Sequence, residues 1–351
     1  MKTIQVNASK KYQVLIGSGL LRQLGAYVTA HSGARRIAII SDSNVWPLYG
    51  STVQDSLSRA GIKEITSYVF PAGEQSKNGS TYLSILEFLA EHQLTRSDCL
   101  IALGGGVVGD MTGFVAATYL RGVDYIQIPT SLLAAVDSSV GGKTAIDLAA
   151  GKNLAGAFYQ PKLVLCDIDT LGTLPEAIFR DGCAEVIKYG VLYDAQLFSH
   201  LKERGLDFSR EEVIARCVEL KRDVVACDEF DKGERQKLNL GHTIGHGVEA
   251  QSHFTVSHGQ AVSIGMAIVS RAGKALGICT PTVCDEIIEV LSHFDLPTKT
   301  GCPAQALYTC ALSDKKRAGD TVNLIVPKAI GDCVIRPTPV EDLKSFIEAG
   351  L

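Results

Sequence analysis

Four of the 8 histidines of this chain lie within residues 242–258, and three of them, His242, His246 and His258, are candidate ligands, whereas His253 falls off the register and is expected on the surface. His242 and His246 are four residues apart, which places both imidazoles on one face of a helix. Zinc-type ions take imidazole nitrogen and carboxylate oxygen as ligands, and a catalytic site keeps one coordination position open. Spacing alone therefore predicts His242 and His246 as metal ligands. The alternative is that one or both are hydrogen-bonded histidines of the core.

Glu185 is the best candidate for a carboxylate ligand. It lies in the run 182–188, whose small and apolar residues predict a buried helix. A carboxylate in such a helix loses its contact with water and needs a partner. A metal ion would be one such partner.

A glycine-rich turn at residues 104–110, with the sequence GGGVVGD, follows an apolar run and precedes a helical pattern. The absence of side chains lets backbone N–H groups approach a pyrophosphate, and the helix start favours an anion. Two features differ from the usual dinucleotide-binding pattern: the turn lies a third of the way along the chain, and Asp124 comes too early to bind a ribose. The alternative is a tight turn that needs glycine for packing.

Lysines and arginines accumulate around these motifs. The run 141–144, GGKT, is not a P-loop, because Asp137 stands where that motif needs its first glycine. Each cation taken singly could be a solvated surface charge. Together with a metal they indicate an anionic substrate that carries phosphate and carboxylate groups. The cations are Arg121, Lys143, Lys152, Lys188, Lys221, Arg235, Lys315 and Lys316.

The pattern of apolar residues predicts an α/β fold with two domains. Up to about residue 170, short β-branched runs alternate with helical stretches, which favours a mostly parallel sheet covered on both faces. The strands are expected at 36–40, 65–70, 99–103, 125–128 and 163–166, and helices at 82–92 and 107–120. Beyond the boundary, residues 171–351 have apolar residues three and four apart and are predicted to be mainly helical. Helices are expected there at 183–201, 211–227, 241–251, 260–276 and 282–294, and a late hairpin at 324–327 and 333–335.

Composition narrows the class of protein. The chain has 351 residues, 46% hydrophobic and 21% charged, and a net charge of −4, so it has no basic surface suited to nucleic acid. No apolar run is long enough to span a membrane, and the first residues lack the apolar segment of a signal peptide. The 10 cysteines are scattered without a Cys-x-x-Cys pair. These features predict free thiols and a cytoplasmic protein.

As a set, these motifs resemble the 3-dehydroquinate synthases, a family within the sugar-phosphate cyclases. The resemblance runs in order from about Asp42 to Arg317. The matching segments are 104–110, 119–122 (YLRG), 129–133 (PTSLL), 136–144 (VDSSVGGKT), 151–153, 184–190 (AEVIKYG), 239–246 (NLGHTIGH), 258–259 and 314–316 (DKK).

The resemblance implies an N-terminal Rossmann-like NAD domain (1–170), a C-terminal helical metal domain (171–351), an active site in the cleft between them, and a homodimer. It implies bound NAD and a divalent metal, zinc or cobalt. The substrate would be 3-deoxy-D-arabino-heptulosonate 7-phosphate, converted to 3-dehydroquinate and phosphate by transient oxidation, elimination, re-reduction and an intramolecular aldol step. This reaction belongs to the shikimate pathway.

The resemblance also assigns residues. The metal ligands become Glu185, His242 and His258, which replaces the spacing-based pair and moves His246 to the substrate. The NAD contacts would be Asp42, Asn44, Glu74, Lys77, Gly105, Gly106, Asp110, Thr130, Ser131, Asp137, Lys143, Lys152 and Thr173. The substrate contacts would be Arg121, Lys143, Asn153, Lys188, Lys221, Arg235, Asn239, His246 and one of Lys315 and Lys316.

Few positions depart from the family pattern, and three other functions compete. Ser131 stands where threonine is common and Ala72 where aspartate is common, and neither change removes a charge that the chemistry needs. Another sugar-phosphate cyclase would share the turn and the ligands, but Asp137, Asn153 and His246 fit dehydroquinate synthase better. A metal-dependent polyol dehydrogenase would need no cationic cluster for its neutral substrate. A binding protein without catalysis would not need the metal, NAD and cation sets together.

Overall fold

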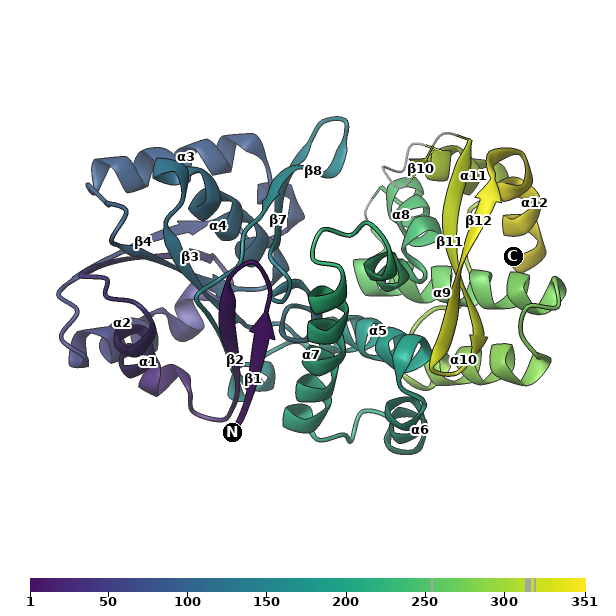
Figure 1. The fold of residues 1–351 in the computed structure, drawn as a ribbon, viewed down its shortest axis with the longest axis horizontal. Coiled ribbons are helices and arrows are strands. Elements are labelled where there is room, and N and C mark those ends of the chain that lie inside the picture. Colours follow the sequence, from purple (N-terminus) through teal and green to yellow (C-terminus); the bar gives the residue numbers. More distant parts are fainter. Residues whose placement is uncertain (254, 313–316, 319) are drawn as a thin grey trace. The chain divides into compact units, whose positions relative to one another are not determined.

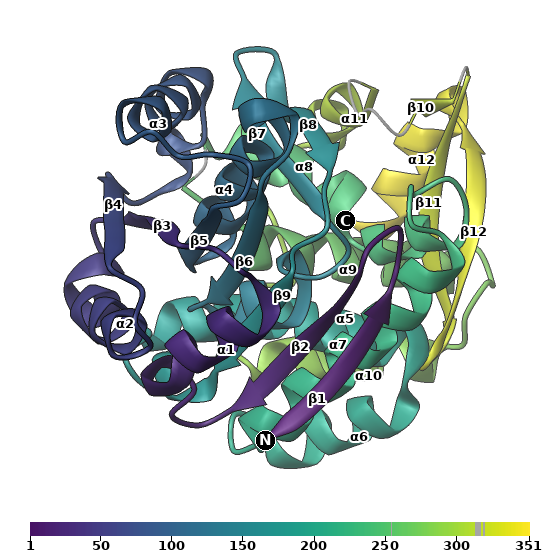
Figure 2. The ribbon, with the colours of Figure 1, turned by 60° about the vertical axis from the view of Figure 1, so that its left-hand side comes forward.

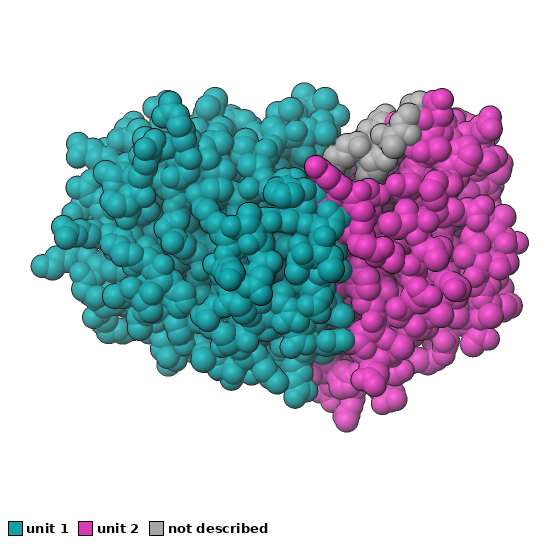
Figure 3. Space-filling model, in the orientation of Figure 1, with its two compact units in different colours: residues 1–174, 210–230 teal, residues 175–209, 231–351 magenta. Residues whose placement is uncertain are grey.

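The computed structural model describes residues 1–253, 255–312, 317–318 and 320–351. The chain forms two compact units, shown in different colours in Figure 3. Unit 1 comprises Met1–Leu174 and Arg210–Phe230, and unit 2 comprises Pro175–Ser209 and Asp231–Leu351. The predicted cations Lys315 and Lys316 lie outside the described residues.

Unit 1 is built on a 7-stranded sheet with the strand order β1-β2-β9-β6-β5-β3-β4. Only the pairing of β1 with β2 is antiparallel, and the remaining neighbours are parallel. The strands are β1 (Lys2–Asn7), β2 (Lys11–Gly17), β3 (Arg36–Asp42), β4 (Glu64–Phe70), β5 (Cys99–Gly104), β6 (Asp124–Pro129) and β9 (Leu163–Asp167). This confirms the predicted mostly parallel sheet.

Helices cover both faces of this sheet, as Figures 1 and 2 show. Alternate residues of a strand point to opposite faces. In β3, Ile37 and Ile39 therefore enter one apolar cluster, and Ala38 and Ile40 enter the other. The first cluster includes α1 (Leu24–His31) and α2 (Trp46–Arg59), and the second includes α3 (Gly79–Glu91) and α4 (Gly106–Thr118). Burial on both faces explains why these strands read as continuous apolar runs.

The remaining elements of unit 1 lie beyond this sheet. Strands β7 (Lys143–Leu148) and β8 (Gly151–Phe158) pair in an antiparallel hairpin. Helix α7 (Arg210–Cys227) also belongs to this unit. Short helical turns are η1 (Leu21–Gln23), η2 (Glu74–Ser76), η3 (Tyr119–Arg121), η4 (Ala134–Ser138) and η5 (Ile168–Gly172).

Unit 2 is mainly helical, as predicted, with a 3-stranded sheet of order β10-β11-β12. Its helices are α5 (Glu176–Tyr193), α6 (Ala195–Arg204), η6 (Glu234–Asn239), α8 (His242–Gln251), α9 (His258–Ala275), α10 (Pro281–His293), α11 (Ala304–Leu312) and α12 (Val340–Gly350). Its strands are β10 (Arg317–Ala318), β11 (Thr321–Ala329) and β12 (Asp332–Pro339), and the last two form the expected late hairpin.

The helical stretch expected at 183–201 is two helices. Asp194 lies between them in an extended conformation, and its carboxylate accepts hydrogen bonds from the backbone N–H of Gln196 and of Leu197, both at 2.9 Å. A side chain that satisfies the first N–H groups starts a new helix. The apolar spacing continues across this break, so it did not reveal the cap.

Helices α8 and α9 touch through glycines. A Cβ atom on Gly265 would collide with the carbonyl oxygen of Gly241, and one on Gly241 would lie 2.6 Å from the carbonyl oxygen of Val262. Gly241 also has a φ of 78°, a left-handed conformation that favours glycine. These glycines let the first turn of α8 lie directly against α9.

The cysteines and the apolar helices were also the subject of predictions. All 10 cysteines are described, and all are free thiols, of which Cys99, Cys166, Cys183, Cys217, Cys279, Cys284 and Cys333 are buried. Among the helices of the described ranges, none combines the length and the apolar character needed to cross a membrane.

We predict that Gly265→Ala lowers the free energy of unfolding. Alanine in a helix interior gains about 1 kcal/mol over glycine, but overpacking costs about 1–3 kcal/mol, and a collision with backbone falls at the upper end. Urea unfolding measures the difference. Gly301→Ala is the control, because a Cβ atom there meets nothing within 4 Å. Equal stability of the two variants would contradict the close approach of α8 and α9.

Candidate functional site

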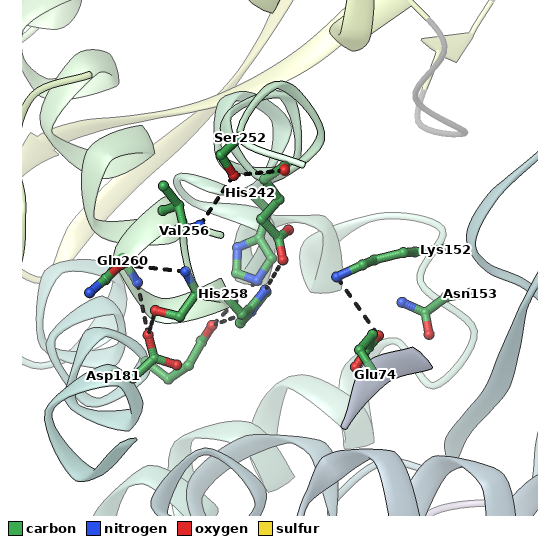
Figure 4. A network of polar contacts seen from close by, with 12 residues as sticks. Glu74, Lys152, Asn153, Asp181, His242, Ser252, Val256, His258 and Gln260 are labelled. Atoms are coloured by element: carbon green, nitrogen blue, oxygen red, sulfur yellow. Dashed lines mark hydrogen bonds and ion pairs between the residues drawn. The ribbon is translucent and has the colours of Figure 1, made fainter. Parts of the chain in front are cut away.

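Three side chains from three helices of unit 2 meet at one point. Glu185 lies in the middle of α5 and is fully buried, and His242 and His258 are the first residues of α8 and α9. One oxygen, Glu185 Oε1, lies 3.4 Å from His242 Nε2 and 3.3 Å from His258 Nε2. Figure 4 shows the two imidazoles beside each other, and their ring centres are 5.3 Å apart.

The chemistry of this donor set fits a zinc-type ion. Ligand atoms of Glu185, His242 and His258 all lie within 4.8 Å of one another. Two imidazole nitrogens and one carboxylate oxygen make a set that leaves a coordination position for substrate. The structure thus brings together the three residues that the family resemblance assigns.

Lys188 compensates the charge of Glu185. Its ammonium pairs with Glu185 Oε2, and both side chains are 1% exposed. Burial raises the pKa of Glu185, but Lys188 and His242 outweigh this and hold the pKa well below its usual range. Glu185 is therefore ionised and available as a ligand at neutral pH.

The pKa values of the two histidines are shifted in opposite directions. Burial lowers the pKa of His242, with Glu185 opposing the shift. Burial also lowers the pKa of His258, but the neighbouring carboxylates of Glu185 and Glu249 outweigh it and raise the pKa to about 10. A metal ion that binds His258 must therefore displace a proton.

The start of α9 fixes His258 against α5. The carboxylate of Asp181, on α5, accepts a hydrogen bond from the backbone N–H of Gln260 at 3.0 Å (Figure 4). It accepts another from the hydroxyl of Ser257. A Cβ atom on Gly259 would collide with the Asp181 carbonyl. The glycine after His258 is therefore required by packing, and it lets α9 approach the helix that carries Glu185.

The other substrate contacts predicted among the described residues of unit 2 lie on α8 or on η6, the turn before it. The ring of His246 is centred 5.7 Å from that of His242 and 6.4 Å from that of His258. Arg235 is 1% exposed and, like Asn239, lies on η6, which directly precedes α8. Asn239 Nδ2 donates to the carbonyl oxygen of Gln236 at 2.9 Å.

In unit 1, most of the residues assigned to NAD follow the carboxyl ends of parallel strands. Asp42 ends β3, Gly105 follows β5, and Thr130 follows β6. The carboxyl ends of parallel strands share one edge of the sheet, where open α/β sheets bind ligands. Asn44, Gly106, Ser131 and Thr173 lie in the segments that leave this edge after β3, β5, β6 and β9.

Most of the glycines in and after the glycine-rich turn have a packing role. Cβ atoms on Gly104 and Gly113 would collide with Val108 and Thr144, and one on Gly109 would lie 2.8 Å from Gln127 Oε1. These glycines serve packing. A Cβ atom on Gly105 would come no closer than 3.4 Å to its nearest neighbour, Ser131 Oγ. The backbone is therefore least crowded at Gly105, where α4 begins.

Buried ion pairs hold the polar residues of unit 1 together. Lys77 Nζ donates to Asp110 Oδ2 and to Asn153 Oδ1, both at 2.6 Å. Lys221, on α7, pairs with the carboxylate of Asp137 and donates to its carbonyl oxygen at 2.7 Å. A more exposed pair joins Lys152 Nζ to Glu74 Oε1 at 3.8 Å (Figure 4).

Two further predicted cations of unit 1 are exposed, one in η3 and one in β7. Arg121 is exposed in η3, after the far end of α4, with a left-handed φ of 68°. Helix α4 has 13 residues, so this end is about 20 Å from the glycine-rich turn. Lys143 is exposed at the start of β7.

Comparisons with known proteins identify the family. Two family models match the chain, 3-dehydroquinate synthase N-terminal over residues 67–181 and 3-dehydroquinate synthase C-terminal over residues 182–317. A 3-dehydroquinate synthase of Streptococcus suis (strain 05ZYH33) is 44% identical over 347 residues, covering 96% of this chain and 97% of the relative. One of Enterococcus faecalis (strain ATCC 47077 / OG1RF) is 42% identical, covering 99% and 98%. The chain belongs to the 3-dehydroquinate synthase family.

Solved structures agree with the fold of this family. A 2-deoxy-scyllo-inosose synthase complexed with carbaglucose-6-phosphate, NAD+ and Co2+ has a TM-score of 0.89 at 23% identity and covers 100% of both chains. A 2-epi-5-epi-valiolone synthase from Streptomyces hygroscopicus subsp. jinggangensis 5008, with NAD+ and Zn2+ bound, has a TM-score of 0.89 at 26% identity and covers 98% of both chains. A probable glycerol dehydrogenase from Sinorhizobium meliloti 1021 has a TM-score of 0.62 at 15% identity and covers 96% of this chain and 95% of its own. The rival functions thus share the fold at much lower sequence identity than the named 3-dehydroquinate synthases.

Glu249 is a buried site residue that was not predicted from the sequence. It lies on α8, is 3% exposed, and its Oε1 is 3.7 Å from His258 Nδ1. The signal in the sequence is its spacing, since it follows His246 by three residues and His242 by seven on one face of the helix. His246, Glu249 and His258 form a second group whose ligand atoms lie within 4.8 Å of one another.

We predict that Lys77→Met destabilises unit 1 of this family member by leaving the Asp110 carboxylate without its ammonium partner. Breaking a buried ion pair costs about 3–5 kcal/mol, and the 20% exposure of the Asp110 side chain favours the lower end. Urea unfolding measures the loss. Lys162→Met is the control, because Lys162 and Asp124 form an exposed pair (42% and 36%) worth about 0–1 kcal/mol. Similar losses of unfolding free energy for both variants would contradict the larger contribution of the buried Lys77–Asp110 pair.

Proposed function

We propose that this chain is a 3-dehydroquinate synthase, a lyase that converts 3-deoxy-D-arabino-heptulosonate 7-phosphate to 3-dehydroquinate and phosphate. The observation that carries the proposal is the buried group of Glu185, His242 and His258 with Lys188, in a chain 41–44% identical to named 3-dehydroquinate synthases over nearly its full length. We propose zinc or cobalt at this group and NAD on unit 1.

The reaction oxidises a ring carbinol, eliminates phosphate, reduces the ketone again and closes the carbocycle by an intramolecular aldol step. Held by Glu185, His242 and His258, the metal would supply a Lewis acid, and NAD on unit 1 would supply a hydride acceptor that is regenerated within the reaction. The new ketone acidifies the neighbouring C–H bond, which lets phosphate leave. Because the hydride returns to the same molecule, no NAD is consumed.

The side chains of unit 2 would hold the ion and the anionic substrate. Glu185 stays ionised because Lys188 neutralises it within the protein interior. We propose that Arg235 and Asn239 bind substrate oxygens from η6. His246, on the same face of α8 as His242, would serve the phosphate and the proton transfers.

The side chains of unit 1 would hold NAD and the remaining substrate groups. The residues proposed for NAD are Asp42, Asn44, Glu74, Lys77, Gly105, Gly106, Asp110, Thr130, Ser131, Asp137, Lys143, Lys152 and Thr173. Their support is the carboxyl edge of the sheet, the open backbone at Gly105 and the buried pairs of Lys77 and Lys221. Lys143, Asn153 and Lys221 are proposed as substrate contacts of this unit. The proposal for Arg121 rests on the family motif alone.

We expect the chain, supplied with the heptulosonate phosphate, NAD and zinc, to release phosphate without net formation of NADH. Phosphate release, NADH absorbance and NMR of the product measure the three parts of this result. A cyclitol as product would favour another sugar-phosphate cyclase, and steady growth of NADH would favour a dehydrogenase.

His258→Ala should lose both metal binding and turnover, with His253→Ala as a matched histidine control. Full activity of His258→Ala with stoichiometric metal would contradict the ligand assignment.

We further propose that the protein is a cytoplasmic homodimer, which the family membership supports. Light scattering in solution should give twice the 37.5 kDa mass of one chain. A mass equal to one chain at micromolar concentration would contradict the dimer without affecting the reaction.

A further inference from the structure

The imidazole of His258 lies between two carboxylates, one at each ring nitrogen. Nε2 is 3.3 Å from Glu185 Oε1, on the side of the proposed metal. Nδ1, on the opposite side of the ring, is 3.7 Å from Glu249 Oε1. Glu185 comes from α5 and Glu249 from α8, so the ring of α9 is held from two other helices.

His242 has the same arrangement with a different partner. Its Nε2 is 3.4 Å from Glu185 Oε1, and its Nδ1 is 3.1 Å from the carbonyl oxygen of Leu240. A carbonyl oxygen can only accept, so a neutral His242 that donates its Nδ1–H to Leu240 has its lone pair at Nε2. In both histidines, Nε2 therefore points to the same Glu185 oxygen, and an acceptor oxygen faces Nδ1.

A neutral imidazole has one proton and can bind a metal only through its unprotonated nitrogen. An acceptor at Nδ1 keeps the proton there and orients the ring, and such partners of metal-bound histidines raise their basicity as ligands. An ionised carboxylate is a stronger acceptor than a backbone carbonyl. Glu249 is 3% exposed, and a carboxylate buried to this extent is costly unless it has charged or hydrogen-bonding partners such as His258.

We propose that Glu249 is the positioning residue of the metal site, which holds the Nδ1 proton of His258 and directs Nε2 to the ion. The proposal deepens the proposed function, because it rests on a metal held by Glu185, His242 and His258. It assigns to Glu249 no contact with substrate or metal.

The competing role for Glu249 is that of a ligand. Ligand atoms of His246, Glu249 and His258 also lie within 4.8 Å of one another, so a second ion could in principle take this group. The two roles differ in stoichiometry: a positioning residue changes the affinity of one ion, whereas a ligand of a second ion changes the number of ions bound.

The first test measures metal affinity of the full chain, with the metal removed and zinc or cobalt returned in competition with a chromophoric chelator. Glu249→Gln keeps the size of the side chain but removes the charge, and we expect it to weaken binding of a single ion about 10–100-fold. Glu289→Gln is the control, because Glu289 is an exposed carboxylate of unit 2 (63%) that pairs with Lys202. Affinity of Glu249→Gln within twofold of the parent chain would overturn the proposal, as would loss of a second bound ion.

The second test needs no variant and so does not depend on one that folds. With zinc bound to the parent chain, 15N chemical shifts of His258 should show a protonated Nδ1 and a metal-bound Nε2. The opposite assignment would overturn the proposal even if Glu249→Gln were poorly folded. In the cobalt form, Glu249→Gln should also shift the visible absorption bands of the ion, which loss of stability alone would not do.

The two proposals fail in different ways. If the parent chain binds neither zinc nor cobalt, the metal site itself is wrong, and the role of Glu249 is overturned with it. If the parent chain binds one ion and turns over substrate while Glu249→Gln binds equally well, the proposed function stands and only the positioning role is overturned.

Discussion

The buried carboxylate of Glu185 is the constraint on which the arrangement of unit 2 depends. An ionised carboxylate removed from water is costly unless charges and hydrogen bonds compensate it. Here Lys188 pairs with one oxygen, and His242 and His258 lie near the other. These groups come from α5, α8 and α9, so the three helices must approach one another closely. The glycines at their crossings make this approach possible: Gly259 lies against Asp181, and Gly265 lies against Gly241.

In unit 1 the parallel sheet, and not the crossing of helices, brings the polar residues together. Its parallel strands bring polar segments to one edge of the sheet, although these segments are far apart in the sequence. The cations among them are already paired within the unit, as in Lys77 with Asp110 and Lys221 with Asp137. Such pairs hold long flexible side chains in place, which would reduce the entropy cost of binding the proposed ligand there.

The sequence predicted five of the seven strands of the sheet and missed β1 and β2; the central strands were found because strands buried on both faces are continuous apolar runs. The strands β3, β5, β6 and β9 begin and end within two residues of their expected bounds. The break at Asp194 and the hairpin of β7 and β8 were not predicted. The first depends on a cap within a continuous apolar spacing, and the second includes the strand β8, in which no residue is fully buried.

The candidate site also has features that the sequence predicts and features that only the tertiary structure decides. The spacing of His242 and His246 and the apolar surroundings of Glu185 are local properties, so the sequence by itself determined that a histidine and carboxylate cluster would form, and the family motifs named its members. Which nitrogen faces which oxygen is not local. Only the packing of α9 on α5 and α8 decided that His258 meets Glu185 at Nε2 and Glu249 at Nδ1, because a ring held between helices takes its orientation from side chains distant in the chain.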